Sequence, residues 1–199
     1  MLNEQGKKRQ IIDAADILFC RFGYAKTSLE DIAREAALGK GTIYYNFDSK
    51  EEIFFEVVKR HYQIFYATLD KELTKKENFA DKFSTVIQLP LKLIYEHAPV
   101  LLDAMKNLAD KYMQKLCAFR NANREKMTNL LTDILEYGIK RGEVNPSLPI
   151  NRIVNIIFDW FLLGDSNIII KSPEEFIKKA EKDYDLIVQI MLQGLMLRG

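Results

Sequence analysis

The sequence predicts an all-α protein, with an N-terminal three-helix helix-turn-helix domain followed by a larger helical domain. Two observations predict this fold class. Apolar residues recur at the 3.6-residue helical period in almost every long segment, and residues that favour helix ends stand at the limits of these segments. No segment alternates apolar and polar residues over the length of a strand, and residues 167–170 are too few to build a sheet.

Composition and charge are those of an ordinary globular chain. The 199 residues include 48% hydrophobic and 29% charged residues, with a net charge of +1. The N-terminus carries no apolar run typical of a signal peptide. The most apolar stretch, 153–164, is too short for a membrane span and contains two polar residues. Cys20 and Cys117 lack metal-ligand spacing. We therefore expect a protein of the reducing cytoplasm.

Residues 7–38 predict two helices and a tight turn. The first helix, 7–22, buries an apolar stripe, and Gly23 is its expected C-cap. Ser28 is a candidate N-cap, and Asp31 follows at the spacing of a capping box. Leu38, within the turn 37–39, is expected to fill the angle between this helix and the next.

The next predicted helix, 40–46, has an unusual division of its side chains. Ile43 and Phe47 are four residues apart and are expected to point inward. Lys40, Thr42, Tyr44 and Tyr45 then face outward. A seven-residue helix is unstable alone in water, so a neighbouring helix must hold it. This arrangement is typical of a helix-turn-helix whose second helix enters the DNA major groove.

Lys50 has two interpretations. It lies in the first turn of a helix that Ser49 opens, where a cation opposes the helix dipole. A bound phosphate at this helix end would remove that penalty. Alternatively, Lys50 is a solvated side chain whose charge Glu51 and Glu52 offset.

Together these residues resemble the DNA-binding motif of the TetR (tetracycline repressor) family over residues 7–60. The sequence differs from the usual family pattern at Ala37, Gly39 and Asn46. A positive φ at Ala37 would cost about 1 kcal/mol. The residues that carry the resemblance are Thr27, Ser28, Ile32, Ala33, Ala36, Lys40, Gly41, Thr42, Ile43, Tyr44, Tyr45, Phe47 and 49–52.

Beyond residue 49, the remaining long segments are predicted helices. A helix is expected from Lys50 to about residue 75, followed by a loop at 74–78. Pro90 is expected to kink a helix at 81–97, and Pro99 to open a short one. A helix is expected at 110–141, either continuous or broken at 120–123, and Gly142 is its expected C-cap.

The C-terminal region contains more apolar surface than one chain can bury. Residues 150–164 are apolar almost all round, which predicts burial on every side. Pro173 begins the last helix, which carries two apolar stripes. One stripe is expected to face the core and the other a partner subunit, as in a four-helix bundle between two copies. The residues predicted for this interface are Ile157, Trp160, Phe161, Leu186, Ile190 and Leu197.

Catalytic and metal-binding patterns are not found in the sequence. His61 and His97 lack the spacing of a zinc helix motif. There is no Gly-rich phosphate loop and no nucleophile elbow. Cys20 is expected to be a small packing residue. We therefore predict no enzyme, no metal and no cofactor.

The family resemblance implies an effector pocket among the helices of the larger domain. Its residues could equally form an ordinary helical core. Asp103, Asn107 or Gln114 could add polar contacts to a largely apolar effector. The predicted pocket residues are Phe83, Ile87, Leu102, Met105, Tyr112, Met113, Phe119, Met127, Phe158 and Leu162.

We therefore interpret residues 1–48 as a DNA-reading head and 49–199 as an effector-binding and dimerisation domain. The implied partners are operator DNA, a second copy of the chain and a small-molecule effector, with repression as the usual outcome. Thr27, Ser28, Tyr45 and Lys50 are expected to bind phosphates. The full set predicted to bind DNA is Thr27, Ser28, Lys40, Gly41, Thr42, Tyr44, Tyr45, Asn46 and Lys50.

A second hypothesis is a helical lipid- or small-molecule-binding protein, or an enzyme on the same scaffold, whose head no longer binds DNA. The unusual residues Ala37 and Gly39 motivate it, as does the equal number of acidic and basic residues in 1–65. The salt dependence of DNA binding distinguishes the two hypotheses.

Overall fold

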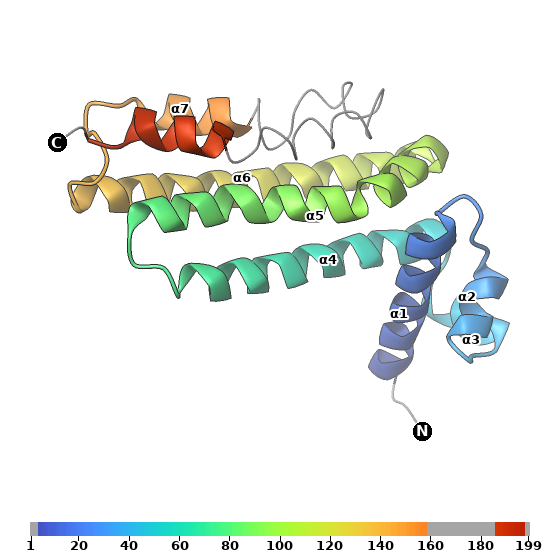
Figure 1. Cartoon of the computed structure of the whole chain (residues 1–199). Coiled ribbons are helices and arrows are strands. Elements are labelled where there is room, and N and C mark those ends of the chain that lie inside the picture. The colour runs from blue at the N-terminus through green and yellow to red at the C-terminus, as the bar shows by residue number, and fades with distance from the viewer. Residues whose placement is uncertain (1–3, 159–185, 198–199) are drawn as a thin grey trace. The chain divides into compact units, whose positions relative to one another are not determined.

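The computed structural model describes residues 4–158 and 186–197 of the chain (Figure 1). These residues are almost entirely helical, and residues 186–195 form a further helical segment. In the described ranges, no helix is both long enough and apolar enough to cross a membrane. The named helices are α1 (Glu4–Phe22), α2 (Leu29–Glu35), α3 (Lys40–Asn46), α4 (Lys50–Leu73), α5 (Phe79–Asn107), α6 (Asp110–Lys140) and α7 (Ile150–Ile157).

The chain divides into two compact units. The first contains residues 1–64 and 97–119, and the second contains residues 65–96 and 120–199. Helices α4, α5 and α6 each contribute one part to each unit. The first unit is larger than the predicted head of 1–48, because the beginning of α4 and residues 97–119 pack on that head.

The core of the first unit explains how two seven-residue helices are held in place. Helix α1 contributes buried apolar residues, on which α2, α3 and the start of α4 pack (Figure 1). Leu38 lies partly buried against this core, as predicted for the turn between α2 and α3. The buried side chains include Ile11, Leu18, Phe19, Tyr24, Ile32, Ile43, Phe47, Ile53 and Phe54.

Ala37 adopts a conformation that glycine usually provides. Its φ of 49° makes it the one non-glycine residue with positive φ in the described ranges. Its N–H donates to the carbonyl of Arg34, and the N–H of Leu38 donates to that of Ala33. These bonds form a Schellman motif, in which the left-handed residue is normally glycine. The turn thus forms despite the alanine methyl group.

We expect Ala37→Gly to raise the free energy of unfolding by about 1 kcal/mol, because it removes the steric cost of the left-handed conformation. Urea denaturation followed by circular dichroism measures this change. Ala36→Gly is the control, since Ala36 is buried with φ −73° and should lose stability instead. A destabilised Ala37→Gly variant would contradict the assigned turn.

The second unit has its own apolar core. Buried residues from the second half of α4, the first part of α5, α6, α7 and residues 186–195 form it. Gly142, with φ 71°, ends α6 as predicted. Gly138 has no room for a side chain, because a Cβ would lie 2.5 Å from Val144 and 2.7 Å from Phe79.

Several sequence predictions for α1, α5 and α6 are wrong. Helix α5 runs unbroken through Pro90 and Pro99, so Pro99 does not open a separate helix. A proline removes a single intrahelical bond, and buried residues on both sides of it keep α5 packed. Helix α6 is likewise continuous through 120–123. Cys20 is exposed instead of packed, and its thiol lies 3.6 Å from an oxygen of Asp16.

The C-terminal helices confirm one prediction and correct another. Val188 and Leu195 are buried, whereas Leu186, Ile190 and Leu197 are exposed, so the last helix has the predicted inner and outer stripes. Helix α7 is not buried on every side, because Ile156 is 45% exposed. The predicted helix start at Pro173 lies outside the described residues.

Candidate DNA-binding site

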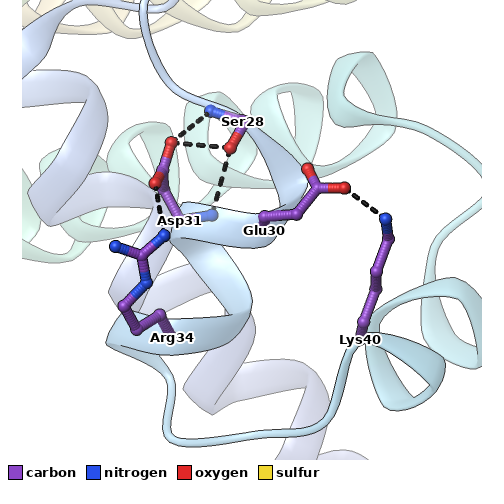
Figure 2. Close-up of polar contacts among 5 residues, drawn as sticks. All are labelled: Ser28, Glu30, Asp31, Arg34 and Lys40. Carbon is purple, nitrogen blue, oxygen red and sulfur yellow. Dashed lines mark hydrogen bonds and ion pairs between the residues drawn. The ribbon is translucent and has the colours of Figure 1, made fainter.

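A complete capping box fixes the beginning of α2. The Ser28 hydroxyl oxygen accepts a hydrogen bond from the Asp31 N–H, and the Asp31 carboxylate accepts one from the Ser28 N–H. Figure 2 shows the same carboxylate between Ser28 and Arg34. The bonds to Ser28 lower the pKa of Asp31. The sequence prediction of this cap is confirmed.

Helix α3 is anchored by one face and exposed on the other. Ile43 is fully buried and Phe47 is 5% exposed, so both point into the core of the first unit as predicted. Tyr44 is 50% exposed and Tyr45 is 77% exposed. Two adjacent exposed tyrosines give this face aromatic rings and hydroxyl groups that a binding partner can contact. The exposed side of α3 therefore has the properties of a contact surface.

Lys40 adds a cation to this surface and is paired with Glu30 of α2 (Figure 2). The pairing raises the pKa of Lys40 and lowers that of Glu30. The Lys40 amine also lies 5.8 Å from the centre of the Tyr44 ring. Because both charged groups are exposed, a stronger anion such as a phosphate can replace Glu30 at low cost.

The remaining predicted residues of α3 differ in accessibility. Gly41 is exposed, and a Cβ there would meet no atom within 4 Å. Thr42 is partly buried. Asn46 folds back on its own helix, where its amide donates to the Thr42 carbonyl at 2.7 Å. The accessible part of α3 is therefore formed by Lys40, Gly41, Tyr44 and Tyr45.

Thr27, Ser28 and Lys50, predicted to bind phosphates, use their side-chain donors inside the protein. Thr27 is buried, and its hydroxyl donates to the Gly23 carbonyl at 2.8 Å. The Ser28 hydroxyl donates to Asp31 at 2.6 Å. The Lys50 amine donates to the carbonyls of Tyr24 and Thr27, both at 2.9 Å. These bonds disagree with the predicted role of the three side chains, because Thr27 and Lys50 satisfy carbonyls of the loop between α1 and α2 and Ser28 caps α2.

Lys50 is neither a solvated cation nor a free phosphate ligand in this arrangement. Its amine lies 4.2 Å from the centre of the Tyr24 ring as well as bonding the two carbonyls. Burial lowers the pKa of Lys50, although the charges of Glu51 and Asp103 oppose the shift. Both sequence interpretations of Lys50 missed this role, since Tyr24 lies 26 residues away.

Sequence reasoning also missed the contacts that hold this region from α5 and α6. Asp103 accepts a hydrogen bond from the Ala25 N–H at 2.9 Å. The Tyr112 hydroxyl lies 2.8 Å from that of Ser49, at the start of α4. From the sequence, Asp103 and Tyr112 are instead expected to contact the effector. Separations of 78 and 63 residues leave no signal in the local pattern.

The predicted effector residues do not form one group within either unit. Tyr112, Met113 and Phe119 belong to the first unit. There, Phe119 packs edge-on against Phe55 and Tyr62. The side chains of Leu102 and Met105, and all of Leu162, lie outside the described residues. Phe83, Ile87, Met127 and Phe158 are buried in the core of the second unit.

The residues predicted for the dimer interface also differ in exposure. Leu186, Ile190 and Leu197 are exposed, but Ile157 is only 3% exposed and belongs to the core of the second unit, which corrects its assignment. Trp160 and Phe161 lie outside the described residues. Next to the exposed residues is an apolar groove of about 410 Å³, between α7 and the helix 186–195.

Comparison with known proteins defines the class. Residues 11–57, which contain α2 and α3, match the family model described as "Bacterial regulatory proteins, tetR family". The fatty acid metabolism regulator protein of Bacillus subtilis is 27% identical over 158 residues, covering 79% of this chain and 81% of that protein. The transcriptional repressor KstR2 of Mycolicibacterium smegmatis is 25% identical over 156 residues, covering 77% and 75%.

A solved structure agrees over almost the whole chain. A transcriptional regulator from Cytophaga hutchinsonii superposes with a TM-score of 0.81 at 21% identity, covering 96% of this chain and all of that one. The fold and the helix-turn-helix thus define a DNA-binding transcriptional regulator. Residues 11–57 thus form a TetR-family DNA-binding domain, and the relatives along most of the chain are TetR-family regulators, which bind operator DNA as dimers and respond to small effectors. Its relatives are regulators and not enzymes.

Proposed function

We propose that this regulator is a repressor that reads its operator with the exposed side of α3 and leaves it when a small, largely apolar effector binds. The observation that carries the proposal is the division of α3. Ile43 and Phe47 hold it on the core, while Tyr44 and Tyr45 remain exposed. Aromatic and cationic side chains on such a helix suit base edges, thymine methyl groups and phosphates of the major groove.

Within this proposal, Lys40 binds a phosphate or a guanine, and Tyr44 and Tyr45 contact bases and backbone. Gly41 lets the DNA backbone come close to α3, because it presents no side chain. Thr42 and Asn46 lie at the edge of this contact. Residues 1–48 form the DNA-reading part in this division, and 49–199 carry effector binding and dimerisation.

The proposed dimer forms through α7 and the C-terminal helix. Ile156, Leu186, Ile190 and Leu197 are each at least 45% exposed. Burying such residues against a second copy removes apolar surface from water. A dimer also supplies two recognition helices, which must lie about 34 Å apart to reach successive turns of the major groove.

The effector class is supported by one relative's name and by the chain's own residues. The Bacillus subtilis relative is named a fatty acid metabolism regulator. The residues predicted for the pocket are mainly Phe, Met, Leu and Ile, which suit an acyl chain or a similar apolar molecule. We propose that effector binding occurs in the cytoplasm, where the operator DNA lies.

A salt titration tests the proposed function. The DNA probe is a duplex that the chain itself enriches from a random-sequence library. Its affinity for the chain should fall steeply between 50 and 200 mM salt, by roughly 10³-fold or more if the dimer makes about six phosphate contacts. Absence of DNA binding at low salt would instead favour the hypothesis of a small-molecule-binding protein with an inactive head.

We expect Glu30→Gln to strengthen binding of this duplex severalfold at low salt. The change removes an acidic group from the DNA-facing side and frees Lys40 from its ion pair. Fluorescence anisotropy measures the effect. Glu35→Gln is the matched control, because Glu35 is an exposed acid on the same helix. Equal effects of the two variants would show that the Lys40 pairing is irrelevant to DNA binding.

A further inference from the structure

The loop between α1 and α2 is held by side chains from two other helices. Its Ala25 N–H donates to the Asp103 carboxylate of α5 at 2.9 Å. Its Tyr24 and Thr27 carbonyls accept from Lys50 of α4. The Asp103 carboxylate thus accepts from a loop N–H, and the Lys50 ammonium group donates to two loop carbonyls. These bonds fix the path of the chain into the N-cap of α2.

The local geometry accommodates the Asp103 carboxylate closely. Gly23 has a φ of +85°, and a Cβ at this position would lie 2.9 Å from the Asp103 Oδ2 atom. The carboxylate therefore occupies space that a side chain would otherwise fill. Ala104, next to Asp103, is fully buried in the core of the first unit, and Val100 and Leu108 pack against it. This part of α5 is consequently held firmly beside the loop.

We propose that Asp103 is a positioning residue for DNA binding, which keeps the α1–α2 loop in the conformation that presents α2 and α3 to the operator. This inference rests on the proposed function. Asp103 acts through the Ala25 N–H and does not touch DNA. The loop leads directly to Ser28, and α2 in turn carries Glu30, the partner of Lys40. A shift of the loop therefore displaces the start of α2 and the side of α3 that binds DNA.

Whether DNA binding weakens or strengthens when the Asp103 carboxylate is removed distinguishes a positioning role from a purely electrostatic one. Removing an acidic residue from a DNA-binding unit should strengthen DNA binding if only the charge matters. Removing the carboxylate that holds the loop should weaken it. Because every cation that can bind a phosphate is retained, the slope of log affinity against log salt should stay close to that of the parent.

The test compares Asp103→Ala, Asp103→Asn and the unmodified chain on the library-selected duplex. We expect Asp103→Ala to bind about tenfold or more weakly with a salt slope close to that of the parent, as for loss of a charge-assisted hydrogen bond. Asp103→Asn keeps an oxygen acceptor and should stay within about threefold of the parent. Asp110→Ala, which removes an exposed acid of the same unit, should not weaken binding.

Hydrogen exchange of the Ala25 amide, followed by NMR, provides a readout that does not depend on DNA. It should accelerate at least about tenfold in Asp103→Ala, whereas the Asp31 amide in the capping box should not change. Unchanged Ala25 exchange, or equal or tighter DNA binding by Asp103→Ala, would overturn the inference. If the unmodified chain does not bind DNA, the proposed function fails, and the Ala25 exchange still decides whether Asp103 holds the loop.

Discussion

Replacing Ile190 by Glu is expected to convert the protein into a monomer and to reduce operator affinity at least about a hundredfold. Ile190 is 59% exposed on the outer stripe of the C-terminal helix and lines the apolar groove beside α7. A carboxylate there would be buried without a partner when two copies associate. A single head would then retain the affinity of non-specific binding, about 10⁻⁴ to 10⁻⁶ M, in place of the specific affinity of a dimer.

Sedimentation velocity and DNA binding should change together in this variant. Gln189→Glu is the matched control, since Gln189 is an exposed neighbour on the same helix but belongs to neither apolar stripe. It introduces the same charge and should leave the dimer intact. A dimeric Ile190→Glu protein would place the interface elsewhere on the chain.

The second large effect is expected for Tyr44→Ala combined with Tyr45→Ala. The two rings provide most of the exposed apolar surface of α3. Each contact to bases or backbone is worth about 1–3 kcal/mol, and a dimer loses every contact twice. The double variant should therefore bind the selected duplex at least about a hundredfold more weakly, as measured by fluorescence anisotropy.

This loss should not be accompanied by unfolding, because α3 is held by the buried side chains of Ile43 and Phe47. Helical circular dichroism and the urea midpoint should stay close to those of the parent. Phe22→Ala provides the control, since Phe22 is a 50% exposed aromatic residue at the end of α1. Normal DNA binding by the double tyrosine variant would exclude α3 as the recognition helix.

Local signals in the sequence were sufficient for the helix-turn-helix. Ser28 and Asp31 form their cap from residues three positions apart, and Ile43 with Phe47 turn inward because they share a helical face. The departure from glycine at Ala37 likewise predicts the strain that its φ of 49° shows. These features depend on neighbours within one or two helical turns, which is the range that spacing can report.

Contacts between segments that are far apart in the sequence could not be predicted from residue spacing. Nothing near Asp103 indicates that its carboxylate accepts the Ala25 N–H, and Lys50 has no local feature that identifies the Tyr24 carbonyl as its partner. Pro99 was wrongly expected to open a helix, since the rule for isolated helices omits packing on both sides. Three of the four predicted phosphate ligands disagree with the structure for a related reason, because Thr27 and Lys50 donate to loop carbonyls and Ser28 donates to Asp31.

Photo-crosslinking from α3 tests the central claim most directly. A photoreactive phenylalanine analogue replaces Tyr45, which is 77% exposed, and in a second sample replaces Ile64, which is 55% exposed on α4. Both samples are irradiated with the library-selected duplex at low salt. The account predicts a protein–DNA crosslink from position 45 that disappears as salt rises, and little or none from position 64. A duplex that binds tightly without crosslinking to position 45 would contradict it.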